Sequence, residues 1–157
     1  YVHKFSKFKF KKNVIKGLKY LTKKKYYIFI VTNQAGIAKG KFKLSDLTKL
    51  HSKLKKYLKE KRIIINDIEY CPYHPNGIIK KYKKKTNYRK PGNLMIKKIL
   101  KKWNVNVKKS FMLGDQKSDE LAAKKSNLYY EYVKNDFYKQ VIKIEKEINN
   151  YWLFFLC

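Results

Sequence analysis

Short apolar runs alternate with longer amphipathic segments along the sequence, and this alternation limits the possible folds more than any other feature. Residues 26–31 (YYIFIV) form a continuous apolar run, which is typical of a strand buried on both faces of a parallel sheet. Apolar residues at helical spacing predict one helix over residues 13–25 and another that begins at Ser45, a good N-capping residue. Strands that alternate with helices in this way predict an α/β domain with a mainly parallel sheet.

The rest of the chain continues the same pattern. Short strands are predicted at residues 63–65, 68–70, 110–113 and 128–133. Helices are predicted from Leu94 to Trp103 and over residues 118–125 and 136–148. Residues 71–91 have two prolines near their start, a run of lysines and no periodicity, so they are expected to form a long loop, functional or disordered. The apolar tail, residues 151–157, is expected either to pack on the sheet or to form a ragged end.

The chain has 157 residues, which fits a single domain over residues 1–157. Its 40 Lys and Arg residues exceed its 11 Asp and Glu residues, and the formal net charge is +29. This charge either attracts nucleic acid or reflects A/T-rich codons, which also encode the abundant Ile, Asn, Tyr and Phe. The lysines are spread along the whole chain and only Arg62 and Arg89 are arginines, whereas single-stranded nucleic-acid sites usually add arginine to stacking aromatics. We therefore favour the codon explanation and do not expect a nucleic-acid partner.

Cysteine content and hydropathy bear on the compartment. Cys71 and Cys157 do not form a disulfide framework, which favours a reducing cytosol and hence a cytoplasmic protein. No signal-peptide pattern opens the sequence, and its longest apolar runs are far too short to span a bilayer, so no membrane association is expected. The sequence leaves the oligomeric state open.

Three polar clusters stand where chemistry is expected in an α/β fold. Ligands bind beyond the carboxyl ends of the strands in open α/β sheets. Thr32, Asn33 and Gln34 follow the run 26–31, Asp115 follows the strand predicted at 110–113, and Lys90 closes the long loop. Each residue alone has an ordinary structural explanation, but together a hydroxyl, an ammonium group and a carboxylate suit phosphoryl transfer. A single carboxylate with a phosphate and waters is also the usual way in which Mg²⁺ is held.

These clusters resemble the motifs of the haloacid dehalogenase (HAD) superfamily of phosphatases, in particular the branch that acts on heptose bisphosphate and histidinol phosphate. VTNQAGIAKGKF (residues 31–42) is similar to the second motif of that branch, CPYHP (71–75) to the start of its specificity loop, RKP (89–91) to the third motif and GDQKSD (114–119) to the fourth. The resemblance implies a three-layer Rossmann-like fold. The glycines Gly36 and Gly40 are expected to let the backbone turn close to the ligand.

The resemblance also implies roles for individual residues. Thr32, Lys90 and Asp115 correspond to the catalytic residues, with Thr32 and Lys90 on the phosphoryl group and Asp115 as the Mg²⁺ ligand. Asp119 is expected to support that carboxylate. The residues expected to contact the substrate are Thr32, Asn33, Gln34, Ala35, Arg89, Lys90 and Gln116.

The first motif of the superfamily is missing. The family mechanism uses an aspartate nucleophile, which forms an aspartyl-phosphate, and a second aspartate two residues later as general acid and base. Both lie on or beside the central strand, yet this chain has no acidic residue before Asp46. We therefore expect the chain to be cut short at its N-terminus, without its first strand, and residues 1–157 alone to lack phosphatase activity.

The specificity loop of the branch often holds zinc through a Cys-x-His pair and a Cys-x-Cys pair, a plausible tetrahedral set. Here Cys71 remains, but Tyr73, Thr86 and Tyr88 occupy the other three positions, and His74 could offer only one nitrogen. Two ligands do not make a structural zinc site, so zinc is not expected. Tyrosines are expected to hold the loop by packing, namely Tyr70, Tyr73 and Tyr82.

The leading functional hypothesis is a cytosolic Mg²⁺-dependent phosphatase that acts on a small sugar phosphate. The resemblance points first to heptose 1,7-bisphosphate, in the pathway to lipopolysaccharide precursors, and next to histidinol phosphate. A DNA 3′-phosphatase remains an alternative because enzymes of that kind have a similar Thr-Asn-Gln motif and the charge of +29 favours a polyanion. A further alternative, from another class, is a non-catalytic basic binding module built on a decayed phosphatase.

Overall fold

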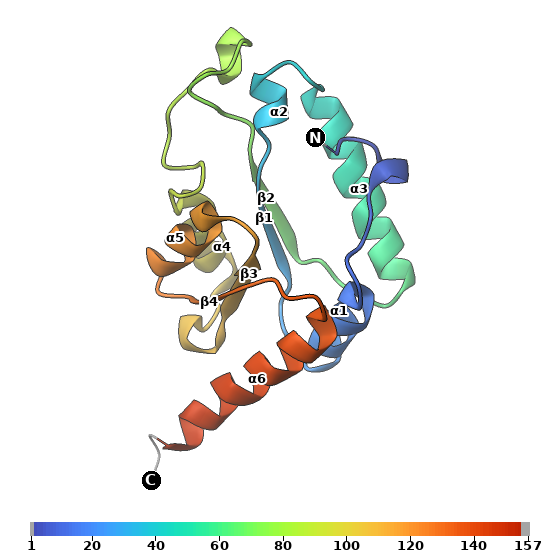
Figure 1. The fold of residues 1–157 in the computed structure, drawn as a ribbon, viewed down its shortest axis with the longest axis vertical. Coiled ribbons are helices and arrows are strands. Elements are labelled where there is room, and N and C mark those ends of the chain that lie inside the picture. The colour runs from blue at the N-terminus through green and yellow to red at the C-terminus, as the bar shows by residue number, and fades with distance from the viewer. Residues whose placement is uncertain (1, 155–157) are drawn as a thin grey trace.

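The computed structural model describes residues 2–154, and this part of the chain contains four short strands among its helices (Figure 1). Strand β1 (Phe29–Asn33) pairs in parallel with β2 (Asp67–Cys71). Strand β3 (Phe111–Gly114) pairs in parallel with β4 (Tyr129–Tyr132). The parallel pairing and the alternation of strands with helices confirm the predicted α/β class.

The helices lie between the strands in chain order. The α-helices of the described residues are α1 (Val14–Lys23), α2 (Ala35–Ala38), α3 (Leu44–Glu60), α4 (Leu94–Trp103), α5 (Lys117–Lys124) and α6 (Phe137–Phe154). Short 3₁₀ turns occur at Phe5–Lys7, Lys80–Tyr82 and Val107–Lys109.

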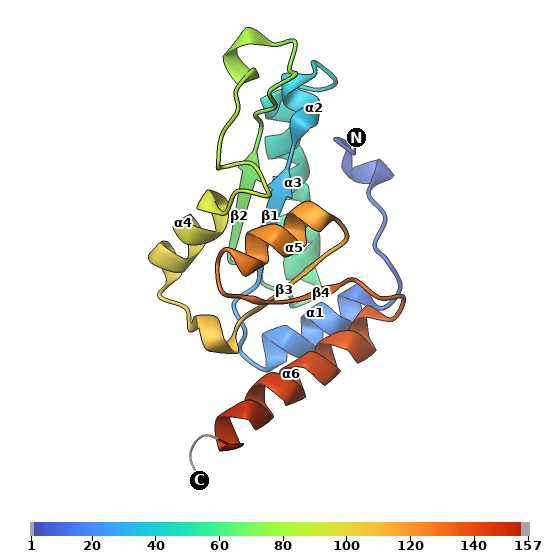
Figure 2. The same ribbon diagram turned by 60° about the vertical axis from the view of Figure 1, so that its left-hand side comes forward.

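The helices cover both faces of the first pair of strands. Figures 1 and 2 show α3 on one side of β1 and β2 and α4 on the other, while α6 runs beside α1 at the opposite end of the molecule from α2. On the α3 side, Leu54 and Leu58 pack on Ile28, Ile63 and Ile65 in one buried cluster. The apolar stripe that predicted α3 is therefore the face that α3 buries.

Strand β1 begins three residues later than the apolar run that predicted it. The N–H of Ile28 donates to the side-chain oxygen of Asn66 (2.8 Å), and the carbonyl of Ile28 accepts from the N–H of Asn66 (2.8 Å). The ladder with β2 begins at the next residue pair, Phe29 and Asp67, and Thr32 and Asn33 belong to the strand instead of following it. All five residues of β1 are half-buried, so the expectation of burial on both faces was wrong in degree.

The predicted strand at residues 63–65 is not present. Ile63 and Ile65 are buried, at 0% and 5% exposure, but they lie in the connection between α3 and β2 and form no ladder. Their apolar character reflects contact with the core. An apolar run of this length does not distinguish a strand from a buried connection.

Two helix ends also differ from expectation. Helix α3 begins at Leu44, and the N–H of Lys43 donates to Asp46 Oδ2 (2.9 Å), so Asp46 closes the first turn instead of a cap at Ser45. Helix α6 runs to Phe154, six residues past the predicted end; the packing of the tail lies outside the described side chains. Within residues 2–154, no helix combines the length and the apolar character needed to cross a bilayer.

Close packing of α1 on α6 requires a glycine at position 17. A Cβ atom at Gly17 would lie 2.5 Å from Cδ1 of Phe137 and 3.3 Å from Cγ2 of Val141. We expect Gly17→Ala to lower the free energy of unfolding by about 1–3 kcal/mol, because the ring of Phe137 must move. Alanine has the higher helix propensity, so propensity alone predicts the opposite sign.

Urea unfolding followed by circular dichroism measures this change. Lys19→Ala, at an exposed position of the same helix, is the control and should change the unfolding free energy little. Stabilisation by Gly17→Ala would show that α1 and α6 are not in close contact.

Candidate functional site

Thr32 is the second-last residue of β1, close to the start of α2. Its Oγ1 accepts a hydrogen bond from Gln34 Nε2 (3.0 Å). A hydroxyl that accepts in this way keeps its own proton for donation. The Thr32 hydroxyl is therefore held by Gln34 and still has its own proton to donate.

Lys90 is buried, with 8% of the residue exposed, and its ammonium group has two partners. Nζ donates to the carbonyl of Val31 (2.7 Å) and forms an ion pair with Oδ1 of Asp119 (2.6 Å). A buried ammonium group requires such pairing because its desolvation otherwise costs several kcal/mol. The sequence prediction placed Lys90 at the site but did not foresee these partners.

The backbone of Lys90 is held by Asn33. Asn33 Oδ1 accepts from the Lys90 N–H (3.0 Å), and Asn33 Nδ2 donates to the Lys90 carbonyl (3.0 Å). This paired hydrogen bond joins the end of β1 to a segment 57 residues further along the chain. Asn33 was predicted to contact substrate; in the structure, both ends of its amide position Lys90.

Asp115 and Asp119 occupy the loop after β3 and the first turn of α5. Asp119 Oδ2 accepts from the backbone N–H groups of Asp115 (3.2 Å) and Gln116 (3.1 Å), so its carboxylate holds this loop as well as Lys90. Asp115 is exposed, and within residues 2–154 its carboxylate has no hydrogen bond or ion pair. A free carboxylate has the donor chemistry that Mg²⁺ prefers.

Arg89 is half-buried beside the start of the long loop. Its Nη1 is buried and makes no hydrogen bond within the described residues. Burial lowers the pKa of the His74 imidazole, and the charges of Arg89 and Lys39 lower it further. Burial raises the pKa of the Cys71 thiol, and Arg89 opposes this rise. The charge of Arg89 is therefore felt by both His74 and Cys71 at the start of the long loop.

Four of the predicted residues meet at one cavity. The cavity has a volume of about 900 Å³ and runs along β1 and β3. Thr32, near the end of β1, and Asp115, just after β3, line it together with Lys90 from the long loop and Asp119 from the first turn of α5. The other residues that were expected to contact the substrate do not line this cavity, namely Asn33, Gln34, Ala35, Arg89 and Gln116.

The cavity separates two strand edges that carry no ladder in the described part of the chain. The Gln34 N–H donates to the Cys71 carbonyl, so the backbone N–H and C=O groups of the even-numbered residues of β1 point towards β2. The backbone groups of Val31 therefore point away from β2. Likewise the Gly114 carbonyl accepts from the Val133 N–H, so the backbone groups of Gly114 point towards β4 and those of Leu113 point away from it. Val31 and Leu113 both line the cavity. The two pairs of strands therefore present open edges to the same space.

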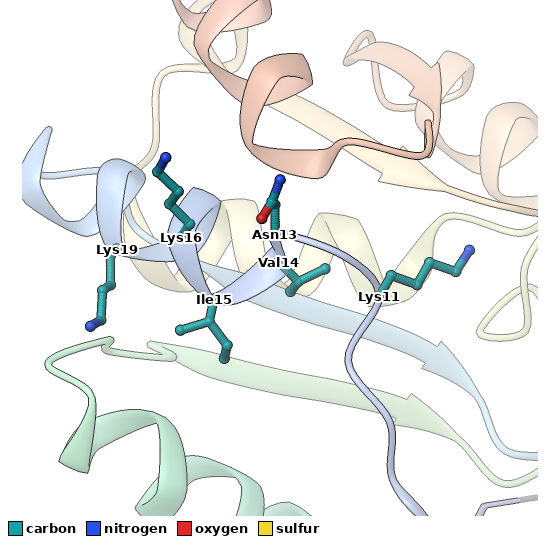
Figure 3. A pocket seen from close by; sticks show the side chains of 6 residues that line it. All are labelled: Lys11, Asn13, Val14, Ile15, Lys16 and Lys19. Carbon is teal, nitrogen blue, oxygen red and sulfur yellow. The ribbon is translucent and has the colours of Figure 1, made fainter.

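A second cavity, of about 380 Å³, lies at the start of α1 (Figure 3). Its cations are Lys11, Lys16 and Lys19. Figure 3 shows these three side chains pointing in different directions, and Lys16 Nζ lies 4.2 Å from the ring centre of Tyr138. Diverging ammonium groups do not form an anion site, so we assign no function to this cavity.

The two glycines after Thr32 have different roles. Gly40 has φ of +64°, which favours glycine at the turn before α3. Gly36 lies in α2, where an added Cβ would clash with the ring of Phe42. Gly36 is therefore required for packing, and the expected role in a close backbone approach to ligand applies at most to Gly40. Ala35, predicted to contact substrate, is buried at the start of α2.

The long loop follows β2 and contains the turn Lys80–Tyr82. The rings of Tyr73 and Tyr82 lie 6.2 Å apart, and Tyr70 and Tyr82 pack on the cluster around Phe42, as expected for a loop held by tyrosines. His74 Nδ1 accepts from the N–H of Asn76 (3.1 Å). The absence of zinc stays a prediction.

Comparisons with known proteins find phosphatases among the relatives of this chain. A family model described as polynucleotide kinase 3 phosphatase matches residues 2–151. The chain is 39% identical over 103 residues to D-glycero-beta-D-manno-heptose-1,7-bisphosphate 7-phosphatase of Rhodopseudomonas palustris, covering 66% of this chain but only 57% of that protein. It is 37% identical over 128 residues to the D-glycero-alpha-D-manno-heptose-1,7-bisphosphate 7-phosphatase of Photorhabdus laumondii, covering 82% of this chain and 70% of the relative.

Solved structures share the fold. A protein described as a HAD-like phosphatase from Mesorhizobium loti superposes with a TM-score of 0.76 at 20% identity, over 85% of this chain and 73% of that one. The D,D-heptose 1,7-bisphosphate phosphatase of B. bronchiseptica, crystallised with magnesium and phosphate, superposes with a TM-score of 0.74 at 21% identity, over 91% and 76%. At these identities the likeness establishes the fold, which agrees with the Rossmann-like prediction.

The ion pair between Lys90 and Asp119 predicts unequal losses of stability when one or the other partner is replaced. Asp119→Ala should lower the free energy of unfolding by about 3–5 kcal/mol, because it leaves a buried ammonium group without its counter-charge. It also removes the acceptor of two backbone N–H groups. Lys90→Met should cost less, because the Asp119 carboxylate keeps those two donors, and the double variant should cost less than the sum.

Urea unfolding of the three variants checks this order. Glu120→Gln, which breaks the exposed pair with Lys117, is the control and should have little effect. Equal losses for Asp119→Ala and Glu120→Gln would contradict the buried pair.

Proposed function

Since this chain belongs to the polynucleotide kinase 3 phosphatase family, within the HAD superfamily of phosphatases, we propose that it acts as a Mg²⁺-dependent phosphatase on a small sugar phosphate. The observation that carries the proposal is the convergence of Thr32, Lys90 and Asp115 on the carboxyl-end side of one cavity. A hydroxyl donor, an ammonium group and a free carboxylate supply what a transferring phosphoryl group requires.

The substrate that we favour is heptose 1,7-bisphosphate. Support comes from the relatives in Rhodopseudomonas palustris and Photorhabdus laumondii, which are named for that substrate. In this proposal the protein works in the cytoplasm and contributes to lipopolysaccharide precursors. Histidinol phosphate is the competing small substrate, and a 3′-phosphorylated nucleic acid is the competing large one.

Thr32 and Lys90 are proposed to bind the phosphoryl oxygens. The Thr32 hydroxyl, held by Gln34, donates to one oxygen, and the Lys90 ammonium group neutralises the charge that develops during transfer. Asp115 would hold Mg²⁺ with its free carboxylate, and the ion when bound would neutralise phosphate charge. Asp119 keeps Asp115 in place by accepting from its backbone N–H.

The nucleophile is proposed to be an aspartate on an extended strand that lies in the cavity between β1 and β3. In the family mechanism its carboxylate oxygen attacks phosphorus, the ester P–O bond breaks, and the second aspartate gives the leaving alcohol a proton. Water then hydrolyses the aspartyl-phosphate. No acidic residue before Asp46 is available for this role.

Such a strand would also change the bonding of Lys90. Val31 faces the open edge of β1, and its carbonyl now accepts from Lys90 Nζ. A neighbouring strand would offer this carbonyl a backbone N–H in its place. Lys90 would then keep Asp119 and turn its remaining donors towards the phosphoryl group.

The nucleophile proposal predicts that residues 1–157 alone do not hydrolyse heptose 1,7-bisphosphate with Mg²⁺. A protein extended before Tyr1 by a short apolar strand ending in Asp-x-Asp should release phosphate, measured in a phosphate-release assay. Lys90→Ala in the extended protein should lower kcat/KM by about 10²–10³-fold, because a preorganised cation is lost.

The matched control is the same extension with its first aspartate changed to asparagine, which should be inactive. Turnover by residues 1–157 alone would refute the proposed nucleophile.

A second assay on the extended protein distinguishes the substrates. We expect the highest kcat/KM for heptose 1,7-bisphosphate, with lower values for histidinol phosphate and for a 3′-phosphorylated oligonucleotide. A higher value for either competitor would reassign the substrate. No turnover of any of them, with salt-sensitive DNA binding that Lys90→Ala leaves unchanged, would indicate a basic binding module.

A further inference from the structure

Glu69 is a buried carboxylate in the middle of β2 that has no part in the proposed chemistry. It is 8% exposed and lies opposite Val31 in the register of the ladder. A carboxylate at such a position costs free energy unless it is paired and hydrogen-bonded. Its partners therefore indicate what the position requires.

Both oxygens of Glu69 are bound by side chains from other segments. Oε2 accepts from the Tyr88 hydroxyl, and Oε1 forms an ion pair with Lys98 Nζ (2.8 Å) from α4. Burial and the bond to Glu69 raise the pKa of the Tyr88 phenol to about 12, so this group stays a donor at neutral pH. The bond to Glu69 raises the pKa of Lys98, which keeps its positive charge.

Tyr88 stands two residues before Lys90, in a turn that is held by hydrogen bonds among its own residues. The Tyr88 N–H donates to Thr86 Oγ1 (3.1 Å), and the Arg89 N–H donates to the Thr86 carbonyl (3.2 Å). The Gly92 N–H donates to the Arg89 carbonyl (2.8 Å). A displacement of Tyr88 is therefore transmitted to Arg89 and Lys90.

This turn is fixed on two sides. Asn33 at the end of β1 holds the Lys90 backbone, and Glu69 on β2 holds the Tyr88 side chain. We propose that Tyr88, through the buried carboxylate of Glu69, is a positioning residue that sets where the Arg89 and Lys90 side chains stand relative to β1. Lys98 supplies the positive charge that stabilises the ionised Glu69 carboxylate, and so keeps this anchor in place. The inference rests on the proposed function, because it assigns Lys90 to the phosphate.

The geometry explains why such an anchor is needed. Lys90 Nζ must reach the Val31 carbonyl and Asp119 from a loop segment, and a loop alone holds a side chain less exactly than a strand does. Tyr88 ties the loop to a strand whose register with β1 is set by the ladder. The position of Lys90 is then determined by the sheet.

Tyr88→Phe in residues 1–157 tests the inference. Hydrogen exchange should become about tenfold faster at the amides of residues 86–92, including the Lys90 N–H that Asn33 holds, while exchange in α3 stays unchanged. Affinity for inorganic phosphate with Mg²⁺, measured by calorimetry, should fall about tenfold. Lys98→Met should produce the same pattern more weakly.

The matched control is Tyr73→Phe, in the same loop, whose hydroxyl makes no hydrogen bond within residues 2–154. It should change neither exchange in 86–92 nor phosphate affinity. Uniformly faster exchange throughout the sheet in Tyr88→Phe would assign Tyr88 a general stabilising role and overturn the inference, as would unchanged exchange in 86–92. If neither residues 1–157 nor the protein extended by the Asp-x-Asp strand binds phosphate, the proposed function is contradicted, and the exchange measurements still decide the role of Tyr88.

Discussion

The buried ion pair between Lys90 and Asp119 is the contact on which the arrangement of the site depends. Lys90 Nζ lies 2.7 Å from the Val31 carbonyl on β1 and 2.6 Å from Asp119 Oδ1 on α5. Within residues 2–154, β1 and β3 share no ladder, so this lysine links the strand that carries Thr32 to the loop that carries Asp115. Such a pair is stable only with good geometry and further hydrogen bonds, and the backbone donors to Asp119 and the Asn33 clamp provide them.

Carboxylates are scarce in this chain, and Glu69 and Asp119 are buried on the two sides of Lys90 in the contacts that hold its segment. Only 11 acidic residues accompany 40 basic ones, yet Glu69 and Asp119 both have less than a tenth of their surface exposed. Each is paired with a lysine and also accepts from a neutral donor. Position 88, which the family resemblance relates to a zinc ligand in other members, is here the tyrosine that binds Glu69. Side-chain hydrogen bonding thus anchors the base of the long loop, close to Lys90.

Local patterns predicted most of the elements, and the errors have identifiable causes. Helices α1, α3 and α4 were predicted from apolar spacing, because the residues that each helix buries recur every three or four positions within one segment. The start of β1 was misplaced because the Asn66 side chain, 38 residues away, binds Ile28. Residues 63–65 were predicted as a strand because burial alone makes a segment apolar. Thr32, Lys90 and Asp115 were predicted to converge from their places at strand ends, and they line one cavity.

Local patterns in the sequence predicted the fold class, most of the elements and Thr32, Lys90 and Asp115 as candidate site residues, because strand ends and motif spacing are local properties. The contacts that hold those residues could not be predicted in this way. Asn33 was expected to face the substrate but binds a backbone 57 residues away, and Tyr88 meets Glu69 across 19 residues. These bonds depend on the register that sets Val31 beside Glu69 and on the path of the loop. Periodicity within a segment carries no information about either, so side-chain partners at this separation follow only from the folded chain.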